Sequence, residues 1–258
     1  MARDAWDPAR YDRFRRERRE PFFDLLALVR RRPGMRVADL GCGTGDLTRL
    51  LHRELQAAAT TGVDTSAAML AESGRFASPG LAFAQADLRD WTPPAPLDLV
   101  FSNAALQWVP NHEALLERLT GLLAPGGQLA VQVPANYDHP SHTLAAEIAR
   151  EAPFREVLEG WTHPAKPVLD PEEYAALLDR LGCRTQHVRL QVYGHHLAET
   201  ADAARWTQGT LLTAYERRLP AAVYARFFER YREALVAHLG SGGPYFFSFK
   251  RILMWGIR

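Results

Sequence analysis

Three glycines at alternating positions, Gly41, Gly43 and Gly45, lie between a short apolar run and a stretch of leucines with helical spacing. Glycines at such a junction let the backbone approach a ligand and turn tightly into a helix, whose first N–H groups are free to donate. The spacing is G-x-G-x-G, whereas the dinucleotide-binding fingerprint is G-x-G-x-x-G. Asp39, two residues before the first glycine, would repel a pyrophosphate. Its carboxylate instead suits the ammonium and sulfonium groups of S-adenosyl-L-methionine.

Two more carboxylates end the next two apolar runs of the sequence. Asp64 can accept two hydrogen bonds from ribose hydroxyls, and Asp87 can accept one from an adenine amino group, with the Leu88 N–H beside it. Ligands of open α/β sheets bind at the carboxyl ends of the strands. We therefore expect these residues to line one cofactor site together with Asp39. A purely structural role is the alternative for each carboxylate.

The elements that must position these residues alternate between strand and helix. Short apolar runs predict strands, and helical spacing with capping residues predicts the helices between them. The strands are expected at 36–40, 60–64, 82–87, 97–102 and 128–134, and the helices at 46–55, 66–75 and 111–123. Strands and helices that alternate at this spacing form right-handed βαβ units around a parallel sheet.

The two ends of the chain differ from this core. Residues 7–32 predict a helical lead-in with apolar faces. A proline-rich stretch follows Pro134. After it, the sequence predicts a strand at 184–192, helices at 199–217 and 220–239, and a closing strand at 246–258.

The composition excludes several classes of protein. Lys and Arg number 31 against 30 Asp and Glu, so the net charge of +1 gives no overall field that favours nucleic acid or an anionic membrane. No apolar run reaches the length of about 18 residues that spans a bilayer, and the charged residues 1–8 do not form a secretory signal. The two cysteines lie far apart and the histidines lack metal-ligand spacing, so neither a disulfide framework nor a metal site is predicted. We expect a cytoplasmic protein.

The segment Asp39-Leu-Gly-Cys-Gly-Thr-Gly45 resembles motif I of the class I S-adenosylmethionine-dependent methyltransferases. Within that class, most of the chain resembles the trans-aconitate 2-methyltransferase branch. The matching pattern comprises Trp6-Asp-Pro8, Tyr11, Phe14, Glu17-Arg18, Pro21, Phe101-Ser-Asn-Ala-Ala-Leu-Gln-Trp-Val-Pro110, His112, Leu122-Leu-Ala-Pro-Gly-Gly-Gln-Leu-Ala-Val-Gln-Val-Pro134 and Asn136. The stretch from Asn103 to Trp108 is far more specific than the glycine loop.

The resemblance implies an α/β fold: a doubly wound, seven-stranded Rossmann-like methyltransferase sheet with an antiparallel last strand and helical lid insertions. It also implies a single methyltransferase domain over residues 1–258, with a cofactor-binding core at 33–135, an N-terminal helical cap at 1–32, and the lid and C-terminal strands at 136–258. The implied cofactor is S-adenosyl-L-methionine. The cofactor-binding residues are expected to be Tyr11, Asp39, Gly41, Gly43, Gly45, Asp64, Thr65, Met69, Asp87, Leu88, Asn103, Ala104 and Trp108.

Four residues are candidates for contact with the methyl acceptor. Trp108 follows the fourth predicted strand and either forms a wall of the methyl-transfer site or merely packs. Trp161 lies in the proline-rich stretch, where a surface position is the alternative. Tyr245 begins an aromatic cluster near Arg251, which is expected to bind an anionic acceptor or, alternatively, to pair with a surface acid. For Tyr11 the alternative to cofactor contact is packing of the N-terminal helix. No catalytic residue and no metal ligand is expected.

The sequence departs from the branch at two places in its C-terminal part. The usual Leu-Arg-Pro reads Leu212-Thr213-Ala214, and Lys250 stands where a proline usually precedes the arginine at Arg251. A tricarboxylate calls for several fixed cations, preferably arginines. The loss of one arginine leaves the identity of the acceptor open, while the methyltransferase class is unaffected.

The predicted function is O-methylation of a small carboxylic acid similar to trans-aconitate. A carboxylate is ionised at neutral pH and needs no general base, so the protein has mainly to align the reactants and exclude water. The alternatives are a hydroxyl, amine or carbon acceptor in another small molecule, or a non-catalytic cofactor-binding protein; the glycine spacing disfavours a nicotinamide-dependent reductase. The expected partner is an anionic small-molecule acceptor, with no nucleic acid and no membrane. The chain is expected to be a monomer or homodimer.

Overall fold

The structure is a computed structural model and describes residues 15–164 and 166–258. Trp6, Tyr11 and the first part of the predicted N-terminal cap lie outside these residues. The described chain divides into two compact units. The first, which we call the sheet unit, comprises 15–135, 167–191 and 250–258, and the second, the helical unit, comprises 136–164, 166 and 192–249.

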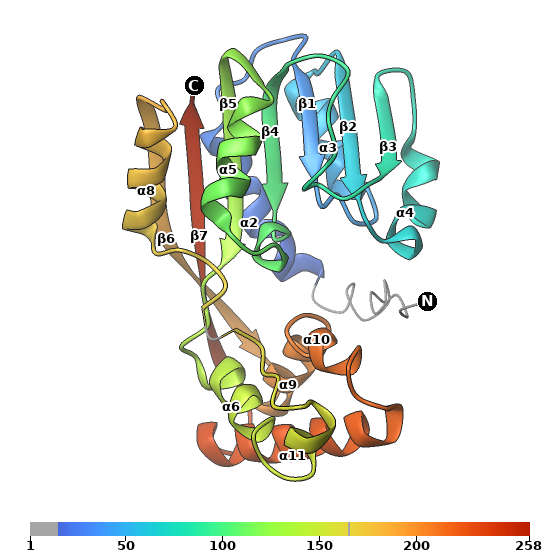
Figure 1. Cartoon of the computed structure of the whole chain (residues 1–258), viewed down its shortest axis with the longest axis vertical. Helices are drawn as coiled ribbons and strands as arrows, with labels where there is room; N and C mark the ends of the chain where they lie inside the picture. The colour runs from blue at the N-terminus through green and yellow to red at the C-terminus, as the bar shows by residue number, and fades with distance from the viewer. Residues whose placement is uncertain (1–14, 165) are drawn as a thin grey trace. The chain divides into compact units, whose positions relative to one another are not determined.

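A seven-stranded sheet in the order β3-β2-β1-β4-β5-β7-β6 organises the fold (Figure 1). Its strands are β1 (Arg36–Leu40), β2 (Ala59–Asp64), β3 (Leu81–Gln85), β4 (Leu97–Asn103), β5 (Leu123–Pro134), β6 (Thr185–Leu197) and β7 (Tyr245–Ile257). The first five strands pair in parallel, and β7 pairs antiparallel to β5. The expected α/β sheet with an antiparallel last strand is therefore confirmed. β6 and β7 contribute residues to both units.

Helices cover both faces of the sheet unit. They are α2 (Arg15–Leu28), α3 (Asp46–Leu55), α4 (Ala67–Ser73), α5 (His112–Gly121) and α8 (Pro171–Arg180), with short 3-10 helices η1 (Gly74–Phe76) and η2 (Leu106–Trp108). In Figure 1, α5 lies in front of the sheet, whereas α2 and α3 lie behind it. Ser66 caps α4, and its hydroxyl accepts a hydrogen bond from the Met69 N–H at 3.2 Å. The doubly wound arrangement places the helices that follow β1 and β4 on opposite faces.

β5 begins at Leu123, earlier than the predicted residue 128. Leu97 pairs with Leu123, the register then shifts, and Leu99 pairs with Gln128. The helix predicted at 111–123 ends at Gly121, and Pro125-Gly-Gly127 lies between the two pairs as an irregularity inside the strand. A single residue pair before the irregularity accounts for the difference.

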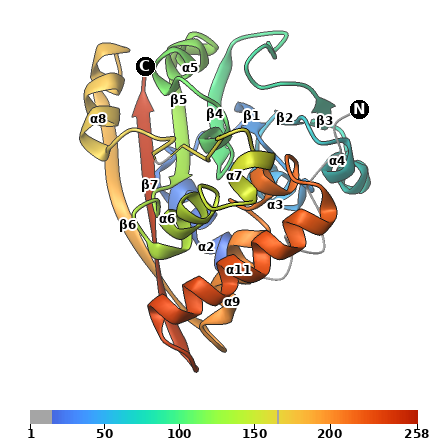
Figure 2. The same cartoon turned by 60° about the horizontal axis from the view of Figure 1, so that its bottom comes forward.

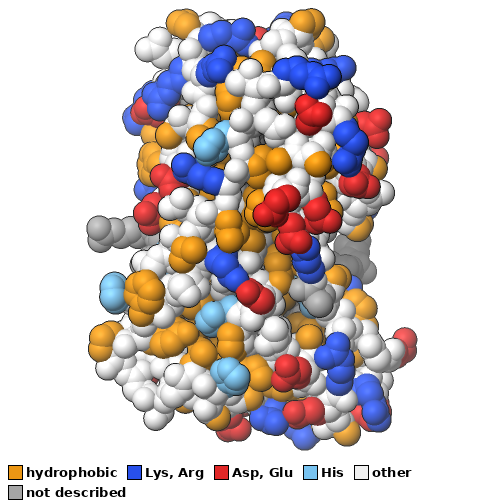
Figure 3. Space-filling model, turned by 90° about the vertical axis from the view of Figure 1, so that its left-hand side faces the viewer, with side chains coloured by type: hydrophobic (Ala, Val, Ile, Leu, Met, Phe, Trp, Pro, Cys, Tyr) orange, Lys and Arg blue, Asp and Glu red, His pale blue; other side chains and the backbone are white. Residues whose placement is uncertain are grey.

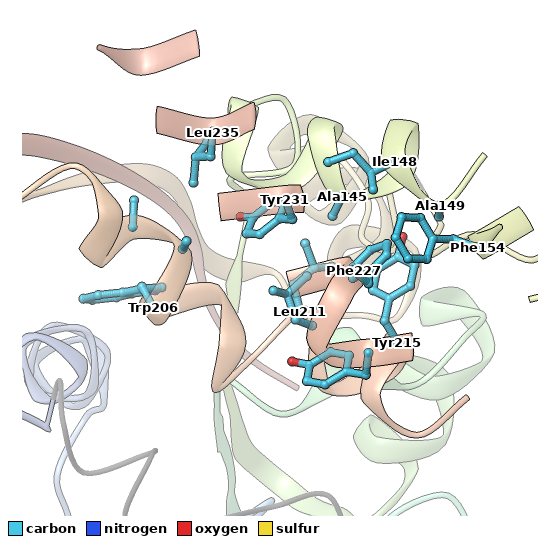
Figure 4. Packing of buried hydrophobic residues seen from close by; sticks show 14 of the residues in the cluster. Ala145, Ile148, Ala149, Phe154, Trp206, Leu211, Tyr215, Phe227, Tyr231 and Leu235 are labelled. Carbon is cyan, nitrogen blue, oxygen red and sulfur yellow. The ribbon is translucent and has the colours of Figure 1, made fainter. Parts of the chain in front are cut away.

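The helical unit has a core of its own. Its helices are α6 (Pro140–Ile148), α7 (Phe154–Val157), α9 (Ala201–Gln208), α10 (Thr213–Glu216) and α11 (Ala221–Leu239). Figure 2 shows α11 running past α6 and α9, against which it packs. In Figure 4, Ala145 and Ile148 of α6 lie near Phe227 and Tyr231 of α11, and all four are buried. The helix predicted at 199–217 is two helices, because the chain turns between α9 and α10.

In the part of the chain that the structure describes, none of the helices has both the length and the apolar composition needed to cross a bilayer.

Candidate cofactor and acceptor site

The glycine loop joins β1 to α3, and its three glycines all have positive φ angles. The angles are 79° at Gly41, 57° at Gly43 and 79° at Gly45. An ideal Cβ on Gly41 would lie 2.1 Å from the Ala105 Cβ, and one on Gly45 would lie 2.7 Å from the Phe83 Cε1. Glycine is therefore required at both positions by backbone conformation and by packing, before any ligand is considered.

Asp39 is a buried carboxylate at the carboxyl end of β1. It is 4% exposed, and its Oδ2 accepts a hydrogen bond from the Thr48 hydroxyl at 2.6 Å. Burial is the main cause that raises the pKa of Asp39 to about 7; the neighbouring carboxylates of Asp64 and Asp46 act in the same direction, and the Thr48 hydrogen bond acts against them. None of the described arginines, lysines or histidines forms an ion pair with Asp39. A cationic ligand group would compensate this buried negative charge.

Asp64 ends β2 and ties the glycine loop to the start of α4. Its Oδ2 accepts from the Gly43 N–H at 2.9 Å, and its Oδ1 accepts from the Ser66 N–H at 2.9 Å. These two bonds give the carboxylate a structural role in the loop. A carboxylate has about four acceptor sites, so these two bonds do not by themselves prevent it from accepting from ribose hydroxyls.

Two further predicted cofactor residues lie after β2, Thr65 and Met69, and they differ in exposure. Thr65 is exposed, and its carbonyl oxygen accepts from the Gln85 side-chain amide at 3.2 Å. Met69 is buried, and its Cε would lie 3.2 Å from an ideal Cβ on Gly43. Met69 therefore packs under the middle glycine of the loop.

Asp87 follows β3 and is held by a neighbour that the sequence analysis did not single out. The Arg89 Nε donates to Asp87 Oδ1 at 3.0 Å and to Oδ2 at 2.9 Å, and the Arg89 N–H donates to Oδ1 at 2.9 Å. These bonds hold the pKa of Asp87 below its usual value. The adjacent Leu88 carbonyl accepts from Arg118 Nη1 at 3.4 Å. An adenine amino group would have to share Asp87 with the guanidinium.

Asn103 ends β4 with a buried acceptor. Its Oδ1 has no hydrogen-bond donor among the described residues. The next residue, Ala104, has a positive φ of 56°, which is rare for a residue with a Cβ, and its N–H donates to the Gln132 carbonyl at 3.0 Å. An unsatisfied buried acceptor next to backbone strain is typical of a ligand site. Trp108, at the end of η2, is 36% exposed.

The strand register brings these residues to one edge of the sheet. β1 pairs in parallel with both β2 and β4, so Asp39, Asp64 and Asn103 lie at neighbouring carboxyl ends. This edge offers a buried carboxylate for a cation, a second carboxylate for hydroxyls, and an unsatisfied carbonyl oxygen. The set fits the ammonium, sulfonium and ribose groups of S-adenosyl-L-methionine.

Arg251 is a buried residue of β7. It is 4% exposed, and its Nη1 donates to Gln132 Oε1 at 3.4 Å. Pro134 of β5 is its register partner. The guanidinium is therefore shielded from solvent. Sequence reasoning missed Gln132, and the only available signal was a glutamine within an otherwise apolar strand.

The remaining acceptor candidates belong to the helical unit. Trp161 packs edge-on against Tyr215 with ring centroids 5.3 Å apart, and the Arg218 guanidinium lies 3.7 Å from the Trp161 centroid. The Tyr245 hydroxyl lies 3.3 Å from His139 Nε2. Trp161 is thus partly buried in packing, and contact of either residue with an acceptor stays a prediction.

Thr213 stands where the resembling branch usually has arginine. It is buried, and its hydroxyl donates to the Thr210 carbonyl at 2.6 Å. Thr213 therefore forms a local hydrogen bond at the start of α10 and supplies no positive charge.

Comparison with known proteins agrees with this site. A family of methyltransferase domains matches residues 11–188. The trans-aconitate 2-methyltransferase of Deinococcus radiodurans is 43% identical over 98% of both chains, and that of Methylobacterium nodulans is 44% identical over 89% of this chain and 88% of its own. Among solved structures, the YcgJ protein of Bacillus subtilis has a TM-score of 0.59 at 15% identity, covering 93% of this chain and 98% of its own.

A methyltransferase of Geobacter sulfurreducens, solved with S-adenosyl-L-homocysteine, has a TM-score of 0.58 at 17% identity, covering 98% of this chain and 100% of its own. At these identities the two structures establish the fold alone. The family rests on the sequence relatives, which match nearly the whole chain. The chain belongs to the trans-aconitate 2-methyltransferase family of S-adenosylmethionine-dependent methyltransferases.

Proposed function

We propose that this methyltransferase esterifies a carboxylate of trans-aconitate or of a closely similar polycarboxylic acid. The observation on which this rests is the buried guanidinium of Arg251. Its Nη1 donates to Gln132 Oε1, and Gln132 is the register partner of Asn103 on the neighbouring strand. A buried arginine is suited to a carboxylate, because its planar fork of N–H groups matches the two carboxylate oxygens. The names of the relatives support the same acceptor.

The cofactor supplies an electrophilic methyl group on a sulfonium when it is bound. Asp39 would compensate its positive charge, Asp64 would accept from the ribose hydroxyls, and Asp87 would accept from the adenine amino group. Asn103 Oδ1 is a further acceptor at the same edge. The other cofactor contacts that we propose are Tyr11, Gly41, Gly43, Gly45, Thr65, Met69, Leu88, Ala104 and Trp108.

The residues of the chain have three tasks in this reaction: to bind the acid, to orient it and to exclude water. The acceptor carboxylate is ionised near neutral pH, so no side chain has to remove a proton from it. Orientation and exclusion of water can supply most of the acceleration for such a transfer. Arg251 would bind the acid, and Trp108, Trp161 and Tyr245 stay predicted acceptor contacts.

The proposed partner is a small anionic molecule rather than a nucleic acid. On the face in Figure 3, blue basic and red acidic side chains are interspersed, in keeping with a net charge of +1. Binding of a nucleic-acid backbone favours a basic patch. We further propose a single methyltransferase domain that acts in the cytoplasm as a monomer or homodimer.

Methylation of a panel of carboxylic acids with radiolabelled S-adenosyl-L-methionine tests the proposal. The expected result is a labelled product from trans-aconitate that mild base hydrolyses, because methyl esters are base-labile and methyl ethers and amines are not. A base-stable product, or no product from any acid in the panel, would contradict carboxylate methylation.

A further inference from the structure

Two glutamines of β5 share one face of the sheet but differ in how their amides are bonded. Gln128 and Gln132 are 1% and 0% exposed, and side chains two or four positions apart on a strand point to the same side. Gln128 Oε1 accepts from the Arg30 N–H at 2.8 Å and from Trp255 Nε1 at 2.9 Å, and its Nε2 donates to the Arg30 carbonyl at 2.8 Å. Gln128 is thus satisfied as both donor and acceptor.

Gln132 is satisfied only as an acceptor. Its Oε1 accepts from Arg251 Nη1 at 3.4 Å, whereas its buried Nε2 has no acceptor anywhere among the described residues. Buried amide groups in native proteins are bonded in the great majority of cases, and each exception calls for an explanation such as a missing ligand. Gln128 shows that a buried glutamine on the same strand and face can be fully bonded, whereas Gln132 is not.

The position of Gln132 adjoins the predicted cofactor residues. It is the register partner of Asn103, and its carbonyl accepts from the Ala104 N–H at 3.0 Å. Neighbouring strands lie about 4.8 Å apart, so a group bound at Gln132 lies within one or two strand spacings of Asn103. On its other side Gln132 pairs with β7, which provides Arg251.

We infer that Gln132 and Arg251 together bind a carboxylate of the acceptor that is not methylated, and that this pair selects di- and tricarboxylic acids over monocarboxylic acids. The Gln132 amide and the Arg251 guanidinium both donate, and one carboxylate can accept from both. Gln132 Oε1 meanwhile holds the guanidinium in place. This inference rests on the proposed function and names the residues that would select its polycarboxylic acceptor.

The pair suits the carboxylate that does not react. A carboxylate bound to a guanidinium has part of its negative charge neutralised, which lowers its nucleophilicity toward a methyl group. An acceptor with a second carboxylate can be anchored by one group and methylated at another. A monocarboxylic acid has a single carboxylate, which can be bound by the Gln132–Arg251 pair or be methylated, but not both.

The matched variants Gln132→Met and Gln128→Met test this inference in the full-length protein. Gln132→Met removes the amide at nearly constant volume, and we expect the KM for trans-aconitate to rise about 10- to 100-fold while the KM for S-adenosyl-L-methionine hardly changes. Gln128→Met should lower the melting temperature, because it removes three bonds, and should leave the KM for trans-aconitate unchanged. An equal rise of that KM in both variants would mean general damage to the sheet and would overturn the inference.

Fumarate and crotonate provide a second readout, because they share a skeleton and differ by one carboxylate. As competitors of trans-aconitate, fumarate should bind the wild-type protein more tightly than crotonate, and Gln132→Met should abolish the preference. Gln132→Glu is nearly isosteric and keeps an acceptor for Arg251, and it should also abolish the preference for fumarate. This second variant keeps the test valid if Gln132→Met fails to fold. A retained preference in both variants overturns the inference. A wild-type protein that neither binds nor methylates trans-aconitate instead defeats the proposed function, and the inference with it.

Discussion

The Thr48 hydroxyl donates a 2.6 Å hydrogen bond to the Asp39 carboxylate in the interior of the sheet unit. The bond favours the ionised form of Asp39, but burial outweighs it and raises the pKa of Asp39 to about 7. The carboxylates of Asp64 and Asp46 act in the same direction as burial. Near neutral pH, binding of a cation beside Asp39 would therefore cause the carboxyl group to release its proton.

Cofactor affinity should increase as the pH rises from 6 to 8. A cationic group bound beside Asp39 favours the carboxylate, lowers its pKa and releases a proton, so binding is weaker where Asp39 is protonated. Calorimetric titration with S-adenosylhomocysteine, which keeps the ammonium group, in buffers of different ionisation enthalpy measures both the affinity and the proton release. Asp39→Asn should bind more weakly and with little dependence on pH. Wild-type affinity that is flat between pH 6 and 8 would contradict the assignment.

The same shift should make the ligand-free protein less stable at pH 8 than at pH 5. The folded pKa of Asp39 lies above its ordinary value of 3.8, so between about pH 4 and pH 7 the folded state binds more protons than the unfolded state. Its contribution to the free energy of unfolding therefore falls as the pH rises through this window. Urea unfolding at several pH values should show a smaller decrease in Asp39→Asn than in the wild type.

Asp64→Ala should weaken cofactor binding by about 1.5–3 kcal/mol, the range for a hydrogen bond to a charged group. The substitution also removes the acceptor of the Gly43 N–H, which loosens the loop. Calorimetric titration measures the affinity, and circular dichroism verifies that the variant is folded. Glu72→Ala is the control, because among the described residues Glu72 forms only an exposed ion pair with Arg75. Unchanged affinity in folded Asp64→Ala would remove Asp64 from the site.

The sheet and the cofactor edge could be predicted because their signals are local. The glycine loop, the caps and the apolar runs each fix a short segment, and parallel pairing then places the acidic strand ends together. In the proline-rich stretch the helices were missed. Pro140 and Pro171 begin α6 and α8, where proline's missing N–H needs no partner, so they initiate helices rather than interrupt them.

The partners of the site residues could not be predicted, because they depend on side-chain direction and on contacts distant in sequence. Arg89 folds back onto Asp87 only through the turn after β3. Gln128 and Gln132 look alike in the sequence, and only the packing of Arg30, Trp255 and Arg251 around them distinguishes the bonded amide from the free one.

Gly41→Ala should destabilise the protein more than Gly34→Ala. Both glycines have φ near 78°, at 79° and 77°, so both variants bear the strain of a left-handed alanine. Only at Gly41 would the new methyl group collide, with the Ala105 Cβ, whereas nothing lies within 4 Å of a Cβ on Gly34. Melting temperatures measure the difference. Equal losses in the two variants would show that the loop can move away from Ala105.

Arg251→Gln should raise the KM of the acceptor and lower kcat/KM roughly 10- to 100-fold, as expected for loss of a charge-assisted contact of about 1.5–3 kcal/mol. Cofactor affinity should hardly change, because Arg251 is on β7, whereas the carboxylates expected to hold the cofactor, Asp39, Asp64 and Asp87, lie at the ends of β1, β2 and β3. Arg251→Lys should be intermediate, since it keeps the charge but loses the planar fork.

Arg258→Gln is the matched control for this last prediction. Arg258 follows the same strand, and its Nη1 donates to the Thr120 carbonyl at 2.7 Å, so its loss should affect the melting temperature and not the KM of the acceptor. Steady-state kinetics with trans-aconitate compare the three variants. Wild-type kcat/KM in Arg251→Gln would mean that Arg251 does not bind the acceptor. A buried guanidinium would then serve only the packing of β7 against β5, and the preference for an anionic acceptor would rest on the relatives alone.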